Sequence, residues 1–151
     1  MLGKQHVSIS LLAVLPFVIP FLFVQGELFP YSLIFLLAVF AGSMIPDADC
    51  GGNSILHYKV GFLDWIMKHI IMKLMVALFN NKKVKRRIEL EVNYAHRGIL
   101  HSPIGVFITS FLLTLLVFLI ILLLQILTFG AFLLLTALFL GLFIGQILHL
   151  M

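Results

Sequence analysis

Residues 102–151 contain no Asp, Glu, Lys or Arg, which makes a run of fifty residues without a formal charge. Soluble domains carry about 25% charged residues, and this run is incompatible with such a fold. A bilayer core requires about 20 apolar residues per helix, so the run is long enough for two membrane spans. The sequence therefore predicts an all-α, multi-pass membrane protein.

The N-terminal part of the chain has the same character, because residues 5–46 contain a single charged residue, Glu27. We expect its first apolar run to be a retained span and not a signal peptide, since it contains Pro16 and Pro20 and lacks an A-x-A-like cleavage site. The prediction is a four-transmembrane-helix bundle in a single membrane domain, 1–151, with spans at about 7–24, 31–45, 103–127 and 131–150.

Local residues mark where these spans begin and end. Pro46 ends the second span, because the residue before a proline avoids the helical region. Ser102 is a predicted N-cap for the third span, and Pro103 suits the first helical position. Residues 128–130 form the only break in the last apolar block.

The basic residues predict the orientation. All ten Lys and Arg lie either at Lys4 or between Lys59 and Arg97. By the positive-inside rule, we expect both termini and the central loop, 50–101, to be cytoplasmic. The single cysteine, Cys50, excludes an internal disulfide.

This topology brings residues that can bind a metal to one membrane face. One histidine opens the first span, two aspartates follow the second, two histidines precede the third, and one histidine closes the fourth. Mixed imidazole and carboxylate ligands suit a transition metal, most of all Zn or Mn, better than Mg or Ca. We therefore expect a metal centre made by His6, Asp47, Asp49, His96, His101 and His149.

The spacing of small residues favours inward-facing stripes on each span. Gly141, Gly145 and His149 recur every four residues, so two small residues permit close helix contact below the imidazole. The other spans repeat the arrangement, with His6, Ser10 and Ala13, with Ala38 and Gly42, and with Ser102, Gly105 and Thr109. After Pro46 we expect an extended segment, in which Asp47 and Asp49 face the same way. Gly98 allows the segment from His96 to His101 to fold back as a loop.

The central loop contains an apolar stretch, Gly61–Phe79, with too many charges for a fifth span. We predict an interfacial amphipathic helix there, with Trp65 at headgroup depth and the basic run 82–87 against anionic membrane lipids. Two other interpretations of this stretch stay open: a solvated face that only anchors the topology, and a lid over the site. A nucleic-acid partner is not favoured, because the run lacks interleaved aromatic residues. His57 and His69 have no matching partner and are expected to be bystanders.

Four segments resemble blocks of a known family. Gln5-His6-Val7, Ile45-Pro46-Asp47-Ala48-Asp49, His96-Arg97-Gly98-Ile99-Leu100-His101-Ser102 and Gly145-Gln146-Ile147-Leu148-His149 resemble, in order, the G-H, P-D-x-D, H-R-G-x-T-H-S and G-x-x-x-H blocks of the YdjM-like proteins. These are described as LexA-binding, inner-membrane-associated hydrolases or membrane-bound metal-dependent hydrolases, so the resemblance implies a protein of the inner membrane of a prokaryote. The H-R-G-x-x-H-S block beside P-D-x-D is the specific part of this resemblance.

The resemblance implies that the six residues named above form the metal centre, with Arg97 next to it. Three positions depart from the family pattern. Cys50 stands where the family often has His, Leu100 replaces the usual Thr, and the chain has no residue four positions after His149, where the family shows an Asp.

The function expected from these residues is metal-dependent hydrolysis at the cytoplasmic membrane face, on an amphiphilic phosphoester or lipid. Asp49 or Asp47 is the candidate general base if it does not bind the metal. Arg97 is the candidate anion-binding residue, because its planar guanidinium matches phosphate oxygens. A non-catalytic adaptor and a metal-ion transporter are the alternatives. Whether the chain forms a homo-oligomer stays an open question, because four short spans are few to enclose a site.

Overall fold

The computed structural model describes residues 3–23, 28–49, 60–79, 99–124 and 128–151. Every regular element in these ranges is helical, which confirms the all-α class. The elements are α1 (Gly3–Phe23), α2 (Phe29–Gly42), the 3₁₀ helix η1 (Ile45–Asp49), α4 (Gly61–Ile66), the π-helix η3 (Met67–Ile71), α5 (Met72–Phe79), the 3₁₀ helix η4 (Ile99–His101), α7 (Pro103–Leu123) and α8 (Phe129–Leu150).

Three helical stretches are long and apolar enough to cross a membrane, which confirms a multi-pass protein. They are Phe29–Asp47, Pro103–Leu123 and Phe129–Leu150, and they agree with the predicted second, third and fourth spans. In α1 the apolar stretch, Val7–Pro20, is shorter than these three. The predicted first span, and with it the count of four membrane helices, therefore stays a prediction.

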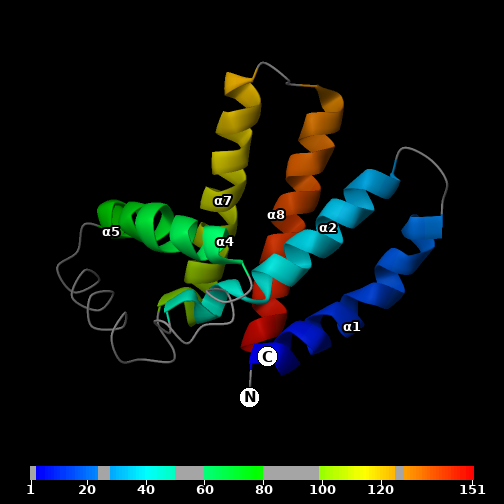
Figure 1. The fold of residues 1–151 in the computed structure, drawn as a ribbon, viewed down its shortest axis with the longest axis horizontal. Coiled ribbons are helices and arrows are strands. Elements are labelled where there is room, and N and C mark those ends of the chain that lie inside the picture. Colours follow the sequence, from blue (N-terminus) through cyan, green and yellow to red (C-terminus); the bar gives the residue numbers. More distant parts are fainter. Residues whose placement is uncertain (1–2, 24–27, 50–59, 80–98, 125–127) are drawn as a thin grey trace.

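The helices gather around α8 (Figure 1). α7 lies beside α8, α2 makes the most extensive contact with α8, and α1 packs on α2 and α8. The end of α2, the start of α7 and the end of α8 lie at one end of the bundle, which we call the site end; the opposite end of the α7–α8 pair is the far end. α4, η3 and α5 follow one another without a break, and η3 contacts η1 and α7.

Side-chain caps fix where α7 and α8 begin. Ser102 Oγ accepts a hydrogen bond from the Gly105 N–H at 3.0 Å, and proline occupies the first turn, as the sequence predicts. At the far end, Thr128 Oγ1 accepts from the Ala131 N–H at 3.2 Å. Each hydroxyl satisfies an N–H that has no partner inside its own helix.

Close packing of α8 on α2 depends on three glycines: Gly141 and Gly145 on α8, and Gly42 on α2, where an added Cβ would lie 2.5 Å from the Leu142 carbonyl oxygen. A Cβ atom added at Gly141 would lie 2.6 Å from both Ala38 Cβ and the Phe35 carbonyl oxygen. At Gly145 an added Cβ would overlap the Val39 carbonyl oxygen. The predicted small-residue stripe on the last span is therefore confirmed.

The predicted stripe on the first span is partly wrong. Ser10 is buried as expected, but Ala13 is exposed, and the buried positions continue at Val14 and Val18. The two valines pack in one cluster with Val39 of α2. A bulky residue every fourth position fills the space against α2, so the contact follows that spacing and leaves Ala13 outside it.

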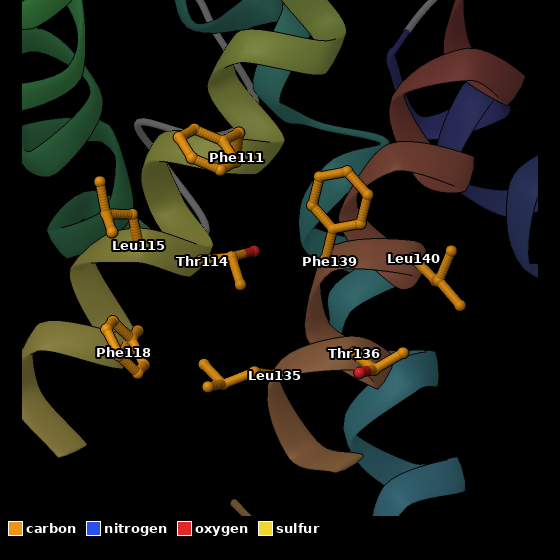
Figure 2. Close-up of a pocket in the computed structure, with 8 residues that line it drawn as sticks. All are labelled: Phe111, Thr114, Leu115, Phe118, Leu135, Thr136, Phe139 and Leu140. Carbon is orange, nitrogen blue, oxygen red and sulfur yellow. The ribbon is translucent and has the colours of Figure 1, made fainter. Parts of the chain in front are cut away.

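A groove of about 420 Å³ separates α7 from α8 toward the far end (Figure 2). Its lining is formed by Phe111, Thr114, Leu115, Phe118, Leu135, Thr136, Phe139 and Leu140. Both threonine hydroxyls donate to carbonyl oxygens of their own helices, at 2.8 Å for Thr114 and 3.0 Å for Thr136. The groove therefore presents hydrocarbon, and it contains none of the predicted metal-binding residues.

Candidate metal centre

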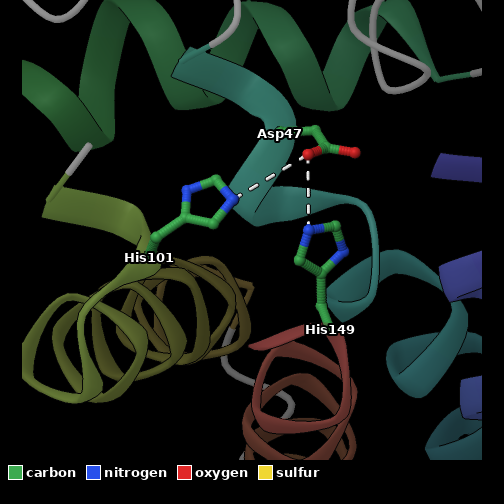
Figure 3. Close-up of side chains that lie close together, drawn as sticks. All are labelled: Asp47, His101 and His149. Atoms are coloured by element: carbon green, nitrogen blue, oxygen red, sulfur yellow. Dashed lines mark ion pairs between the residues drawn. The ribbon is translucent and has the colours of Figure 1, made fainter. Parts of the chain in front are cut away.

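Three helix ends deliver one side chain each to a common point at the site end (Figure 3). Asp47 lies in η1, directly after α2; His101 ends η4, directly before α7; and His149 lies in the last turn of α8. One ligand atom from each residue can be chosen so that all three lie within 4.8 Å of one another. These are three of the six residues that the predicted topology brings to one membrane face.

The carboxylate lies between the two imidazoles. Asp47 Oδ1 is 3.3 Å from His149 Nε2 and 4.0 Å from His101 Nε2. The two rings meet edge to face, with centroids 5.5 Å apart and planes at 68°. Only 5% of the surface of His149 is exposed, compared with 9% for Asp47. The site is therefore almost closed by the ends of the helices.

A backbone contact determines which ring nitrogen of His149 carries the hydrogen and which one presents a lone pair to the carboxylate. His149 Nδ1 lies 2.7 Å from the Ser43 carbonyl oxygen, which can only accept a hydrogen bond. Nδ1 therefore carries the hydrogen, and in the neutral ring Nε2 has a lone pair directed at Asp47. Histidines that bind metals typically donate such a hydrogen bond from the other ring nitrogen, because it fixes the orientation of the ring.

The donor set fits a transition-metal ion. A nitrogen lone pair and a carboxylate oxygen that face each other require a cation, either a proton or a metal ion. Two ligand atoms on tetrahedral zinc, each about 2.0–2.1 Å from it, lie about 3.3–3.4 Å apart, as His149 Nε2 and Asp47 Oδ1 do. The His101 distance of 4.0 Å is wider than that edge, so His101 has to move toward Asp47 by a fraction of an ångström.

The central helix supports both segments that carry the site. Ile45, two residues before Asp47, and Leu100, one residue before His101, are fully buried. They share a cluster with a stripe on the helix from α4 to α5, formed by Met67, Ile71 and Met75. This apolar contact fixes η1 and η4 on the same surface and thus helps to hold Asp47 near His101.

Comparison with known proteins assigns the chain to a family. The sequence profile of the YdjM inner membrane protein family matches residues 1–151. The chain belongs to this family. Neither the curated proteins nor the solved structures contain a match. Family membership agrees with the predicted resemblance and with an inner-membrane, multi-pass protein.

The structure brings together three of the six residues expected from the YdjM-like pattern, namely Asp47, His101 and His149. The side chains of His6 and Asp49, and the whole of His96 and Arg97, lie outside the part of the chain that the structure describes. Leu100, which replaces the threonine of the pattern, is buried in the apolar cluster. His69, an expected bystander, stacks on Trp65 with centroids 5.2 Å apart.

The prediction of an extended segment after Pro46 is wrong, because residues Ile45–Asp49 form a 3₁₀ helix. The expectation that Asp47 and Asp49 face the same way depended on the two-residue period of extended backbone, and a 3₁₀ helix repeats every three residues. Pro46 is compatible with this turn because it lies near its start, where an N–H has no partner in the helix.

Two groups at this site were not predicted from the sequence. The Ser43 carbonyl is a backbone atom and leaves no trace in residue identity. Gln146 was overlooked although it stands in a charge-free span, where a polar side chain has to find a partner. Its position one turn before His149 was the available indication.

Proposed function

We propose that this YdjM family member is a membrane-bound metal-dependent hydrolase that acts at the cytoplasmic face of the inner membrane. The observation that carries the proposal is the convergence of Asp47, His101 and His149, with the Nδ1 hydrogen of His149 already committed to Ser43. The helix ends deliver these residues from segments far apart in the sequence. A buried cluster of this composition is typical of a transition-metal site.

The residues of this chain would divide the work in a simple way. Asp47, His101 and His149 would hold the ion, and His6 and His96 are the candidates to complete the ligand set. A bound ion lowers the pKa of its water and polarises the bond to be cleaved. Asp49 is the proposed general base, and Arg97 the proposed contact for a phosphate oxygen, as the sequence predicts.

The position of the cluster supports the proposed class of substrate. It lies at the ends of three candidate spans, so in a bilayer it lies near the headgroup layer. The far groove is apolar and separate from it, so the chemistry belongs to the site end. An amphiphile that places a phosphoester or carboxylic ester at headgroup depth therefore suits the site best.

The test uses purified full-length protein in mixed lipid bilayers with Zn or Mn. Released phosphate and fatty acid are measured for the wild type, for His101→Ala and for Thr136→Ala, a control in the far groove. We expect turnover in the wild type and in Thr136→Ala, and none in His101→Ala. If the wild type shows no turnover, or if His101→Ala retains the turnover of the wild type, the hydrolase proposal is wrong.

The alternatives have weaker support in the described residues. A transporter requires ionisable or polar groups along a path across the bilayer. In the described helices α1, α2, α7 and α8 and in the C-cap of α2, the buried polar side chains lie within about two turns of the site end; they are Ser10, Ser43, Thr109, Ser110, Gln146 and His149. A non-catalytic adaptor is separated from a hydrolase by its metal content, which should be below one ion per chain.

For the helix from Gly61 to Phe79 we propose contact with anionic headgroups on the cytoplasmic side. Its buried stripe faces the core, whereas Phe62 and Trp65 are 75% and 52% exposed, and Lys73 is exposed as well. Tryptophan is typical of the membrane interface, and a lysine near an anionic surface contributes about 1 kcal/mol of binding. This arrangement supports the predicted interfacial helix and the predicted cytoplasmic position of the central loop.

Trp65 is the only tryptophan, so its fluorescence reports on this helix without a label. Lipids brominated at known depths should quench it most strongly near the headgroups, and anionic lipid should increase the quenching. Lys73→Gln should reduce the anionic effect, and Lys4→Gln, which removes the same charge elsewhere, should reduce it less. Quenching that is strongest at the bilayer centre, or absent, contradicts an interfacial helix.

A further inference from the structure

A buried amide joins α7 to α8 just below the metal-binding cluster. Thr109 Oγ1 donates to Gln146 Oε1 at 2.7 Å, and Gln146 Nε2 donates to Ser110 Oγ at 2.8 Å. All three side chains have no exposed surface. We call these three residues the polar clasp. It lies in two candidate membrane spans, where an unpaired polar group is costly.

The clasp lies close to the residues that would hold the ion. Gln146 precedes His149 by three residues, which is about one helical turn. Thr109 and Ser110 lie about two turns into α7, which begins directly after His101 and Ser102. The two hydrogen bonds therefore fix how far α7 and α8 slide along each other and how α8 is rotated, at the level where both helices deliver their imidazoles.

The Thr109 hydroxyl does not depend on Gln146 for a hydrogen-bond partner. The Thr109 hydroxyl has one hydrogen, and the carbonyl oxygens of Gly105 and Val106 lie 2.8 Å and 3.1 Å away. Without Gln146 this hydroxyl would still donate within its own helix, as Thr114 does. The added contact thus links two helices and contributes mainly to their relative position.

α8 is fixed from its other side by the glycine contact with α2. Gly145, next to Gln146, touches the Val39 segment, and Ser43 at the end of α2 holds His149 Nδ1. α8 is therefore held by α2 on one side and by α7 on the other, at the same height. Since Asp47 follows α2 and His101 precedes α7, these contacts together determine the three-residue geometry.

We infer that Gln146 is a positioning residue for the metal centre: through Thr109 and Ser110 it keeps His149 in register with His101. The metal part of this inference rests on the proposed function. Loss of an outer contact of this kind typically lowers metal affinity about 10–100-fold. Gln146 itself is not expected to touch the ion or the substrate.

The experiment compares Gln146→Leu, Ser110→Ala and the control Thr114→Val in the full-length protein in nanodiscs. Thr114→Val removes a hydroxyl that donates to its own helix, one turn further along α7. Co²⁺ affinity is measured by visible absorption, and nitrogen NMR of labelled histidine reports the Nδ1–H form of His149 without metal. Helix content is checked by circular dichroism.

We expect Gln146→Leu to weaken Co²⁺ binding about 10–100-fold, Ser110→Ala to weaken it less, and Thr114→Val to leave it within about twofold. In the metal-free protein, Gln146→Leu should also lose the uniform Nδ1–H signal of His149. Unchanged affinity with an unchanged NMR signal overturns the inference.

Failure of the proposed function gives a different result. If the wild type binds no Co²⁺, the metal-centre proposal fails, and only the NMR signal tests the role of the polar clasp. A retained Nδ1–H signal of His149 in Gln146→Leu then overturns that role, and a lost signal supports it. If Gln146→Leu does not insert into the membrane, Ser110→Ala decides by the same two measurements.

Discussion

The two ends of the α7–α8 pair come from the same charge-free stretch of sequence and are built differently. At the site end, small and polar residues bring the helices into contact, with Gln146 hydrogen-bonded across the pair and Gly145 against α2. At the far end, Phe and Leu side chains line an open groove of about 420 Å³. Close contact and polar pairing occur where three side chains have to meet, and bulky apolar residues suffice where α7 and α8 line the groove.

We expect the largest difference in stability between the two ends when one methyl group is added to a glycine at each end. Gly145→Ala would drive a Cβ into the α2 backbone, and we expect a loss of about 3 kcal/mol in stability, at the upper end for overpacking. Gly130→Ala at the far end would meet the Tyr31 hydroxyl at 2.9 Å, which is the end of a flexible side chain, so the loss should stay below about 0.5 kcal/mol. Reversible unfolding in mixed micelles measures both, and equal losses would contradict the contrast.

Removal of the metal should act on the site end alone. At an ion concentration about 100 times the dissociation constant, a bound ion contributes about 2.7 kcal/mol, which a chelator should abolish. Amide hydrogen exchange should rise near His101 and His149, and less around the far groove. In Asp47→Asn the chelator should have little effect. An equal effect of the chelator in Asp47→Asn would show that the ion is bound elsewhere.

Filling space should be tolerated at one end and not at the other. Ser110→Leu places a larger side chain in a fully buried position and breaks the contact with Gln146, so we expect a loss of about 2 kcal/mol. Thr136→Leu enlarges a side chain that lines the open groove, and its effect should stay within about 0.5 kcal/mol. The same unfolding assay measures both variants. Similar losses would mean that the groove is closed in the bilayer.

The smallest expected effects concern the two helix caps. Ser102→Ala removes a partly buried cap at the site end, and we expect a loss of about 1 kcal/mol. Thr128→Ala removes an exposed and longer hydrogen bond at the far end, where water replaces the hydroxyl, so the loss should be about 0.5 kcal/mol. A larger loss for Thr128→Ala would reverse the order proposed for the two ends.

Sequence patterns predicted the elements whose determinants are local. Runs of apolar residues gave three of the predicted spans, Ser102 and Pro103 gave the start of α7, and the spacing of Gly141, Gly145 and His149 gave the inward face of α8. The convergence of Asp47, His101 and His149 followed from the alternation of span directions. These features depend on periodicity and charge, which a single sequence displays.

The features that the sequence did not predict depend on contacts between helices. The pairing of Gln146 with Thr109 and Ser110 requires the relative position of α7 and α8, which packing determines. Ala13 was expected inside because it is small, but the fit of Val14 and Val18 against α2 decided that face. The 3₁₀ turn at Asp47 reflects how η1 packs through Ile45, which residue propensity alone does not show.

Elemental analysis of the purified protein tests whether Asp47, His101 and His149 form a metal centre. We expect at least one Zn or Mn ion per chain in the wild type and in Thr136→Ala, and a fraction of that in Asp47→Ala and His101→Ala. Wild-type protein that retains no ion after purification with Zn or Mn present, or variants with the full metal content, would contradict it.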